Sequence, residues 1–239
     1  MQPIYWALIA FAVVAYIGIR MLIDSGARIS GLREWADLNS YTFQPEKDAS
    51  IGPHYGELKR LTLYQNCSAS NVVRGPLGAY KFCAFDFVDL DRRRGSQHTR
   101  SFAAVSTSFA AVVVETDLAL PSLIVERQTL SDKVAKAFGD EGVLFESEAF
   151  NRRFMVRSPN KVRAIEVLQP AVQQLLIDTP LFEFSSSLHV LELHGSLVLA
   201  RSRSDQFFTA RDYPEVLELL VAILTLIAAS GEIKGDAAN

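Results

Sequence analysis

The sequence has few of the residues that mark catalytic and metal sites. It contains two cysteines, Cys67 and Cys83, and four histidines among 239 residues. The spacing of the two cysteines is neither a disulfide framework nor a zinc-binding pattern, and so small a number fits a reducing compartment. No G-x-S-x-G element, Walker loop or dinucleotide-binding fingerprint is present. The sequence therefore predicts no catalytic residue, no cofactor and no metal, and it favours a non-enzymatic role.

An excess of positive charge is also missing. There are 24 Lys and Arg residues against 27 Asp and Glu residues, so the formal net charge is -3. Nucleic-acid-binding domains usually carry a basic surface, so no nucleic-acid partner is predicted. Hydrophobic residues make up 49% of the chain and charged residues 21%, which is typical of a folded protein.

One long apolar run is present, at the N-terminus. Residues 4–19 contain no charged side chain, and the stretch Pro3–Ile23 is interrupted only by Arg20. A membrane-spanning helix needs about 20 mostly apolar residues, and an arginine near its end can reach the interface. A cleaved signal peptide is the alternative, but it requires a basic start and a small-residue cleavage site, and neither is clear here. We predict a transmembrane anchor over residues 1–24.

The charges that flank this run predict its orientation. Arg20, Arg28 and Arg33 follow the centre of the run, whereas no lysine or arginine precedes it. Because positive residues remain on the cytoplasmic side of a membrane, we expect the rest of the chain to be cytoplasmic.

Strand-like segments dominate the first half of the chain beyond the anchor, and helix-like segments become frequent in the second half. We predict an α+β fold with an antiparallel sheet and packed helices, since strand–helix–strand alternation is too rare for a parallel sheet. The soluble domain is expected over 28–230, with 28–128 and 129–230 as candidate sub-lobes, and a flexible tail over 231–239. Strands are expected at 41–43, 58–64, 80–87, 101–115, 123–126, 143–146 and 153–157, a hairpin at 188–203, and helices at 30–39, 129–139, 158–177 and 212–230.

The last of these helices raises a second membrane question. Within residues 214–229 the only polar side chains after the first turn are Glu218 and Thr225. About 14 apolar residues are typical of a buried core helix, and a span would need more. The alternative is an amphipathic helix that lies on the bilayer; we favour packing in the core.

The soluble part resembles a set of uncharacterised bacterial single-pass membrane proteins, grouped only as domains of unknown function. The motifs that carry the resemblance are Tyr41-Thr42-Phe43, residues 71–75 (NVVRG), Phe85-Asp86-Phe87, residues 121–126 (PSLIVE) and residues 148–156 (EAFNRRFMV). The resemblance implies a single-pass protein of the bacterial inner (plasma) membrane. It adds no catalytic residue.

Two groups of residues are candidates for binding. Arg92, Arg93 and Arg94 lie in a charged hairpin tip and could contact anionic lipid headgroups, although a solvated turn that blocks edge pairing is favoured. Asn71, Arg74 and Asp86 are the second group. We favour a structural role, with Asn71 in a turn and Arg74 paired to Asp86, over a ligand pocket formed by all three.

A third group offers metal-ligating side chains but does not complete a site. On a strand, Glu192 and His194 share one face whereas His189 points to the other, and zinc requires three or four ligands. The sequence thus favours a membrane-anchored binding or scaffold domain with an unidentified protein partner. The alternative is a membrane-associated enzyme or a small-ligand or lipid-binding protein.

Overall fold

The computed structural model describes residues 26–62, 67–91, 105–128, 142–183 and 188–230. These residues form an α+β fold in which all pairs of named strands are antiparallel, so this part of the prediction is confirmed. The apolar run Pro3–Ile23 and the predicted helix at 129–139 lie outside the described residues. Within the described residues, no helix has the length and apolar character needed to cross a bilayer.

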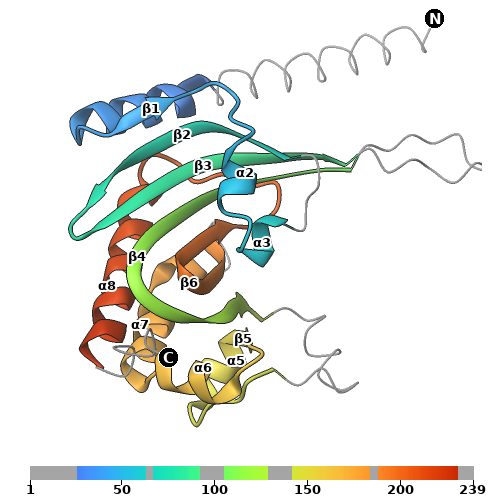
Figure 1. Ribbon diagram of the computed structural model, residues 1–239, viewed down its shortest axis with the longest axis vertical. Coiled ribbons are helices and arrows are strands. Elements are labelled where there is room, and N and C mark those ends of the chain that lie inside the picture. Colours follow the sequence, from blue (N-terminus) through green and yellow to red (C-terminus); the bar gives the residue numbers. More distant parts are fainter. Residues whose placement is uncertain (1–25, 63–66, 92–104, 129–141, 184–187, 231–239) are drawn as a thin grey trace, which may run out of the picture.

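Figure 1 shows the elements around one strongly curved sheet. In chain order they are a first helix over residues 26–38, β1 (Thr42–Gln44), α2 (Ile51–His54), α3 (Lys59–Thr62), β2 (Cys67–Leu77), β3 (Tyr80–Asp91), β4 (Val105–Arg127), α5 (Glu148–Arg153), β5 (Phe154–Arg157), α6 (Lys161–Val167), α7 (Pro170–Asp178), a 3-10 turn (Pro180–Phe182), β6 (Leu188–Ser202) and α8 (Asp212–Ala229).

Strand β4 is the centre of the sheet. Its 23 residues pair with β3 along the first half and with β5 along the second half, while β6 pairs along its other edge. The register against β6 shifts between Glu115 and Leu123, where the strand bends (Figure 1). The sequence predicted two strands separated by Pro121, but the structure has one continuous strand, because irregular pairing at the bend accommodates the proline.

The two faces of the sheet bury separate apolar clusters. The larger cluster joins the sheet to the first helix, to α8 and to the helices α5–α7. The smaller cluster lies under α2 and α3 and is built mainly from aromatic and aliphatic residues of β2, β3 and β4. Side chains on β3 alternate between these clusters, as the period of two in a strand requires. This alternation explains why residues 82–87 are buried on both faces.

The predicted hairpin at 188–203 is wrong. Residues 188–202 form the single strand β6, which pairs with β4 on both sides of Gly195. Gly195 has a positive φ of 57° and lies opposite Leu120, at the bend of β4. A glycine in this conformation resembles a hairpin turn in the sequence, but here it lets β6 follow the curvature of its partner.

The predicted strand at 58–64 is also wrong, because Lys59–Thr62 is the short helix α3. The buried carboxylate of Glu192 on β6 accepts hydrogen bonds from the backbone amides of Lys59 (2.7 Å) and Arg60 (2.9 Å). These amides have no partner within such a short helix, so a distant carboxylate satisfies them. No local pattern reveals this contact, since Glu192 lies more than 130 residues away along the chain.

Other predictions from periodicity are confirmed. Helix α8 packs in the larger cluster through eight buried side chains, which confirms the prediction of a core helix at 212–230. The predicted helix at 158–177 is divided into α6 and α7, and α7 begins at Pro170, because proline cannot continue a helix but suits its first turn. Val143 forms only an isolated bridge with Val156, so the strand expected at 143–146 is reduced to one pair.

The contact between Glu192 and α3 predicts a pH-dependent stability. Burial raises the pKa of Glu192, opposed by its hydrogen bonds from the amides of Arg60 and Lys59. A carboxyl group with a raised pKa in the folded state stabilises the fold most below its unfolded pKa, and this contribution is lost as the pH rises through the folded pKa. Urea unfolding should therefore show a larger stability difference between the wild-type protein and Glu192→Gln at pH 4 than at pH 7. If the stability of the wild-type protein relative to Glu192→Gln instead increased with pH, the pKa of Glu192 would not be raised in the folded state.

Candidate functional site

The sheet separates the predicted site residues onto opposite faces. Arg74 lies directly opposite Cys83 in the β2–β3 register, and both face α2. Asp86 is three residues further along β3, so its side chain points to the other face. The predicted pair between Arg74 and Asp86 is therefore wrong, and the reason is the period of two in β3.

Asp86 instead pairs with Arg28 of the first helix. The two guanidinium Nη atoms lie 2.6 and 2.7 Å from the carboxylate oxygens, while Nε donates to the carbonyl oxygen of Phe208 at 2.7 Å. The side chains of Asp86 and Arg28 are only 5% and 17% exposed. Burial lowers the pKa of Arg28, but the hydrogen bonds and charge of Asp86 outweigh this effect and leave the pKa raised. Arg28 therefore remains charged.

Asn71 completes this buried cluster. Its side-chain amide donates to Oδ2 of Asp86 at 2.8 Å, and its backbone has a positive φ of 52° at the irregularity between Ser70 and Val73. The left-handed conformation of Asn71 agrees with its predicted role in the backbone geometry, but Asn71 lies at a bulge within β2 and not in a turn. This bulge brings its side chain to Asp86. The structure joins Asn71 to Asp86 and leaves Arg74 apart from both. Their satisfied hydrogen bonds indicate a structural cluster.

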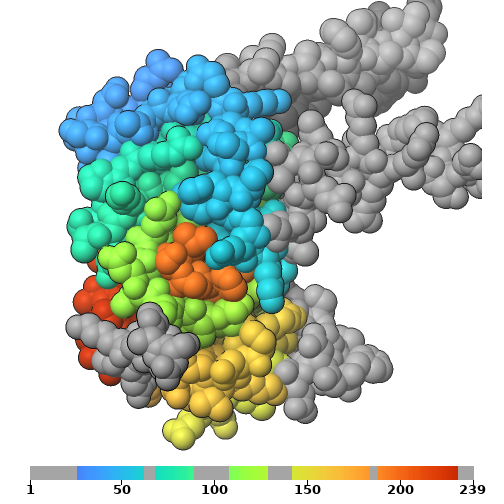
Figure 2. All heavy atoms as spheres, viewed as in Figure 1, coloured from blue at the N-terminus to red at the C-terminus, as the bar shows by residue number. Residues whose placement is uncertain are grey.

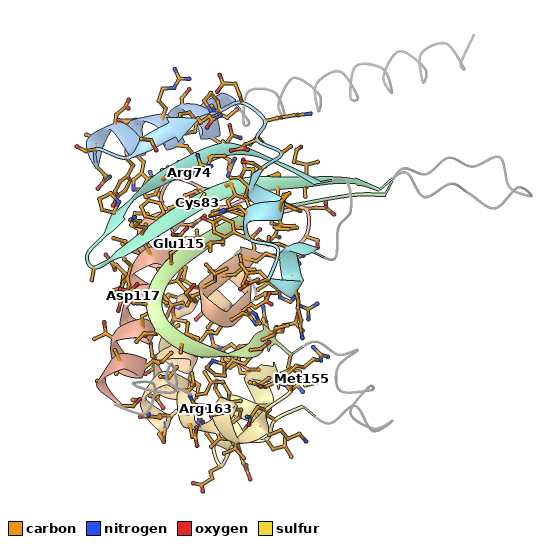
Figure 3. The ribbon with its side chains drawn as sticks, in the orientation of Figure 1. Arg74, Cys83, Glu115, Asp117, Met155 and Arg163 are labelled. Atoms are coloured by element: carbon orange, nitrogen blue, oxygen red, sulfur yellow. The ribbon has the colours of Figure 1, made fainter. Side chains whose placement is uncertain are left out.

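Arg74 lies in a groove between α2 and the neighbouring strands. The groove has a volume of about 950 Å³. Figure 3 shows Arg74, Cys83 and Glu115 on the neighbouring strands β2, β3 and β4, to the left of α2. The residues that line the groove are Thr42, Ser50, Ile51, Pro53, His54, Tyr55, Arg74, Gly75, Pro76, Lys81, Phe82, Cys83 and Glu115.

Three close contacts join the polar groups in and beside the groove. Arg74 lies 3.1 Å from Oδ2 of Asp48. Tyr55 donates its hydroxyl to Glu115 at 3.0 Å, and the Nε2 atom of His54 lies 3.8 Å from the same carboxylate oxygen. The groove therefore combines an apolar wall with charged side chains, which is the composition of small-ligand sites.

The ionisable groups in the groove favour binding over nucleophilic catalysis. Burial raises the pKa of the Cys83 thiol, although the charge of Arg74 opposes the shift. Burial also raises the pKa of Tyr55, and the negative charge of Glu115 adds to the shift. Both groups are thus held in their neutral, protonated forms. Since the thiolate is the nucleophilic form of cysteine, Cys83 is held in its unreactive state.

The remaining candidate residues do not build a second polar centre. Arg92, Arg93 and Arg94 lie outside the described residues. Glu192 binds α3, and no group of three or more potential metal ligands occurs in the described part of the chain. Sequence reasoning missed Tyr55, Cys83 and Glu115 as one site, because only the strand register and the position of α2 bring them together.

The buried pair of Arg28 and Asp86 predicts a large loss of stability. Asp86→Ala leaves the guanidinium and the amide of Asn71 without their acceptor, so it should lower the free energy of unfolding by about 3–5 kcal/mol. Replacing both partners by apolar residues, as in Arg28→Met with Asp86→Leu, should recover much of this loss. Urea unfolding of the three proteins measures both effects. Equal losses in the single and double variants would rule out the ion pair as the cause.

Comparisons with known proteins show a similarity in fold only. No protein-family profile matches the sequence, and no curated protein is similar to it at a significant level. Among solved structures, the crystal structure of the mycobacterial trehalose monomycolate transport factor A, TtfA, is similar to this chain with a TM-score of 0.56. The two sequences are 10% identical, and the similarity covers 88% of this chain and 98% of the other. The chain therefore shares its overall fold with TtfA.

Proposed function

We propose that this protein is a membrane-tethered, non-enzymatic factor that holds an amphipathic lipid in the groove beside α2. The observation that carries the proposal is the groove itself. Its volume of about 950 Å³ is large enough for part of an acyl chain, and Ile51, Pro53 and Pro76 supply apolar surface. Arg74 and Lys81 place positive charge in the same groove for a polar or anionic head.

Two further arguments support a lipid. The side chains of Cys83 and Tyr55 stay protonated, so the groove offers neutral hydrogen-bonding groups and no activated nucleophile. The structure with the same fold belongs to a protein named as a transport factor for trehalose monomycolate, a lipid. We infer a related task for this chain, in which the groove carries or presents a lipid at a membrane.

The groove proposal is tested by filling the groove and by reversing its charge. Pro53 and Lys81 are exposed residues of its lining, so Pro53→Trp and Lys81→Glu should leave the core intact. We expect each to lower the lipid that co-purifies with the full-length protein by about tenfold, measured by native mass spectrometry, a loss of about 1.4 kcal/mol in binding.

Two exposed positions provide matched controls. Val162→Trp adds the same bulk on α6, and Arg211→Glu makes the same charge change before α8. Both should retain lipid at the wild-type level. If no lipid accompanies the wild-type protein, the groove proposal fails, and a scaffold role becomes the better function. That role is favoured by the exposed apolar side chains of Leu144, Val162 and Ile165.

We further propose that Pro3–Ile23 is the tether and that the described domain lies on the cytoplasmic side of a bacterial inner membrane. The support is the length of the apolar run and the arginines that follow it. Deletion of residues 1–23 should release a soluble protein, detected by fractionation, and a reporter fused after Asn239 should be active in the cytoplasm. Retention of the truncated protein on membranes after a high-salt wash would contradict the tether.

A further inference from the structure

A second concave site lies where α3 meets the junction of β5 and α6. It is a cleft of about 460 Å³, separate from the groove beside α2. Figure 2 shows the segment of α3 in contact with the segment of β5 and α6 on this side of the molecule. The residues that line the cleft are Lys59, Arg60, Ser122, Ile124, Gly142, Val143, Arg157, Ser158, Pro159 and Lys161.

Four positively charged side chains meet in this cleft. Lys59 and Arg60 come from α3, whereas Arg157 ends β5 and Lys161 begins α6. Tertiary packing thus brings α3 to the consecutive elements β5 and α6, which lie about 100 residues further along the chain. Like charges repel one another when they are brought together, so such an arrangement is favourable where an anion lies between them.

One carboxylate orients two of these cations. Glu126 on β4 binds Arg60 through one oxygen and Arg157 through the other, the latter at 2.5 Å. Its side chain is 16% exposed, so the bridge is largely shielded from water. A single carboxylate fixes both guanidinium groups but neutralises only one of their two charges. Glu126 therefore acts as a positioning residue for the wall of the cleft.

The cleft also has donors that the described residues do not satisfy. The Nε atom of Arg60 is buried and has no hydrogen-bond partner among the described residues. Lys161 is exposed and forms no ion pair within the described part of the chain. A buried donor without a partner is costly, and the exposed ammonium group of Lys161 is available to an anion in the cleft.

We propose that this cleft binds a phosphate-bearing anion between Lys59, Arg60, Arg157 and Lys161. A phosphate oxygen accepts hydrogen bonds from planar guanidinium groups, and ammonium groups add attraction without a strict direction. The volume suits a phosphate ester, and Ile124, Val143 and Pro159 provide an apolar wall for the group attached to it. The same chemistry occurs in a free phosphate ester and in the headgroup of an anionic phospholipid.

The test uses the full-length protein in maltoside micelles, which contain no phosphate. Binding of inorganic phosphate is measured by calorimetry at constant ionic strength, and binding of short-chain phosphatidylglycerol is measured in the same micelles. The variants are Lys161→Gln, at an exposed position, and Arg157→Gln. We expect each to weaken binding by about fivefold to tenfold. Arg211→Gln removes one positive charge far from the cleft and should bind within about twofold of the wild-type protein.

The two ligands distinguish the source of the anion. Binding of phosphate that depends on Lys161 and Arg157 supports a soluble phosphate ester, and binding of phosphatidylglycerol alone with the same dependence supports a lipid headgroup. Absence of binding to both ligands overturns the proposal. Equal weakening by Arg211→Gln also overturns it, because the attraction would then be a property of the whole surface. Thermal unfolding of each variant separates lost binding from lost folding. These outcomes are independent of lipid in the groove beside α2.

Discussion

The architecture depends on the pairing of β4 along both of its edges. The strand is long enough to give β3 and β5 successive places on one edge, while β6 follows the other edge through the bend. Residues 109–114 of β4 are fully buried, so helices must cover both faces of the sheet. The first helix and α8 cover one face and α2 with α3 cover the other. Displacing β4 would therefore disrupt both apolar clusters.

Much of this architecture is readable from the sequence where the evidence is local. The buried β3–β4 pairing follows from alternating apolar residues, and α8 follows from its apolar spacing and acidic first turn. The predictions that failed depend on contacts between distant residues. The sequence around Gly195 predicts a turn, but in the structure Gly195 lies within β6, opposite the bend of β4. Lys59–Thr62 was predicted as a strand, but it is a helix whose backbone amides bind the distant Glu192.

The candidate site illustrates the same limit. Arg74 was predicted as a candidate together with Asn71 and Asp86, but its predicted partner, Asp86, lies on the other face of the sheet. The groove requires α2, Cys83 and Glu115, and only the strand register brings them together. The cleft beside α3 depends on a helix that the sequence did not predict. On the opposite face of β2, a Cβ at Gly75 would lie 2.2 Å from the ring of Tyr41, so packing against the larger cluster leaves no room for a side chain there.

The clamp of Arg28 on Asp86 also limits how far the domain can move from a bilayer. Only five peptide units separate Ile23, the end of the predicted span, from Arg28. An extended chain covers at most about 3.5 Å per residue, and residues 26–28 are helical, so this connection reaches less than about 18 Å. Because the guanidinium group of Arg28 is bound to Asp86 on β3, this short connection limits the distance between the domain and the end of the predicted span. If Pro3–Ile23 crosses the bilayer, the sheet stays close to the membrane surface, and a ligand of the domain would have only a short distance to travel between the domain and the bilayer.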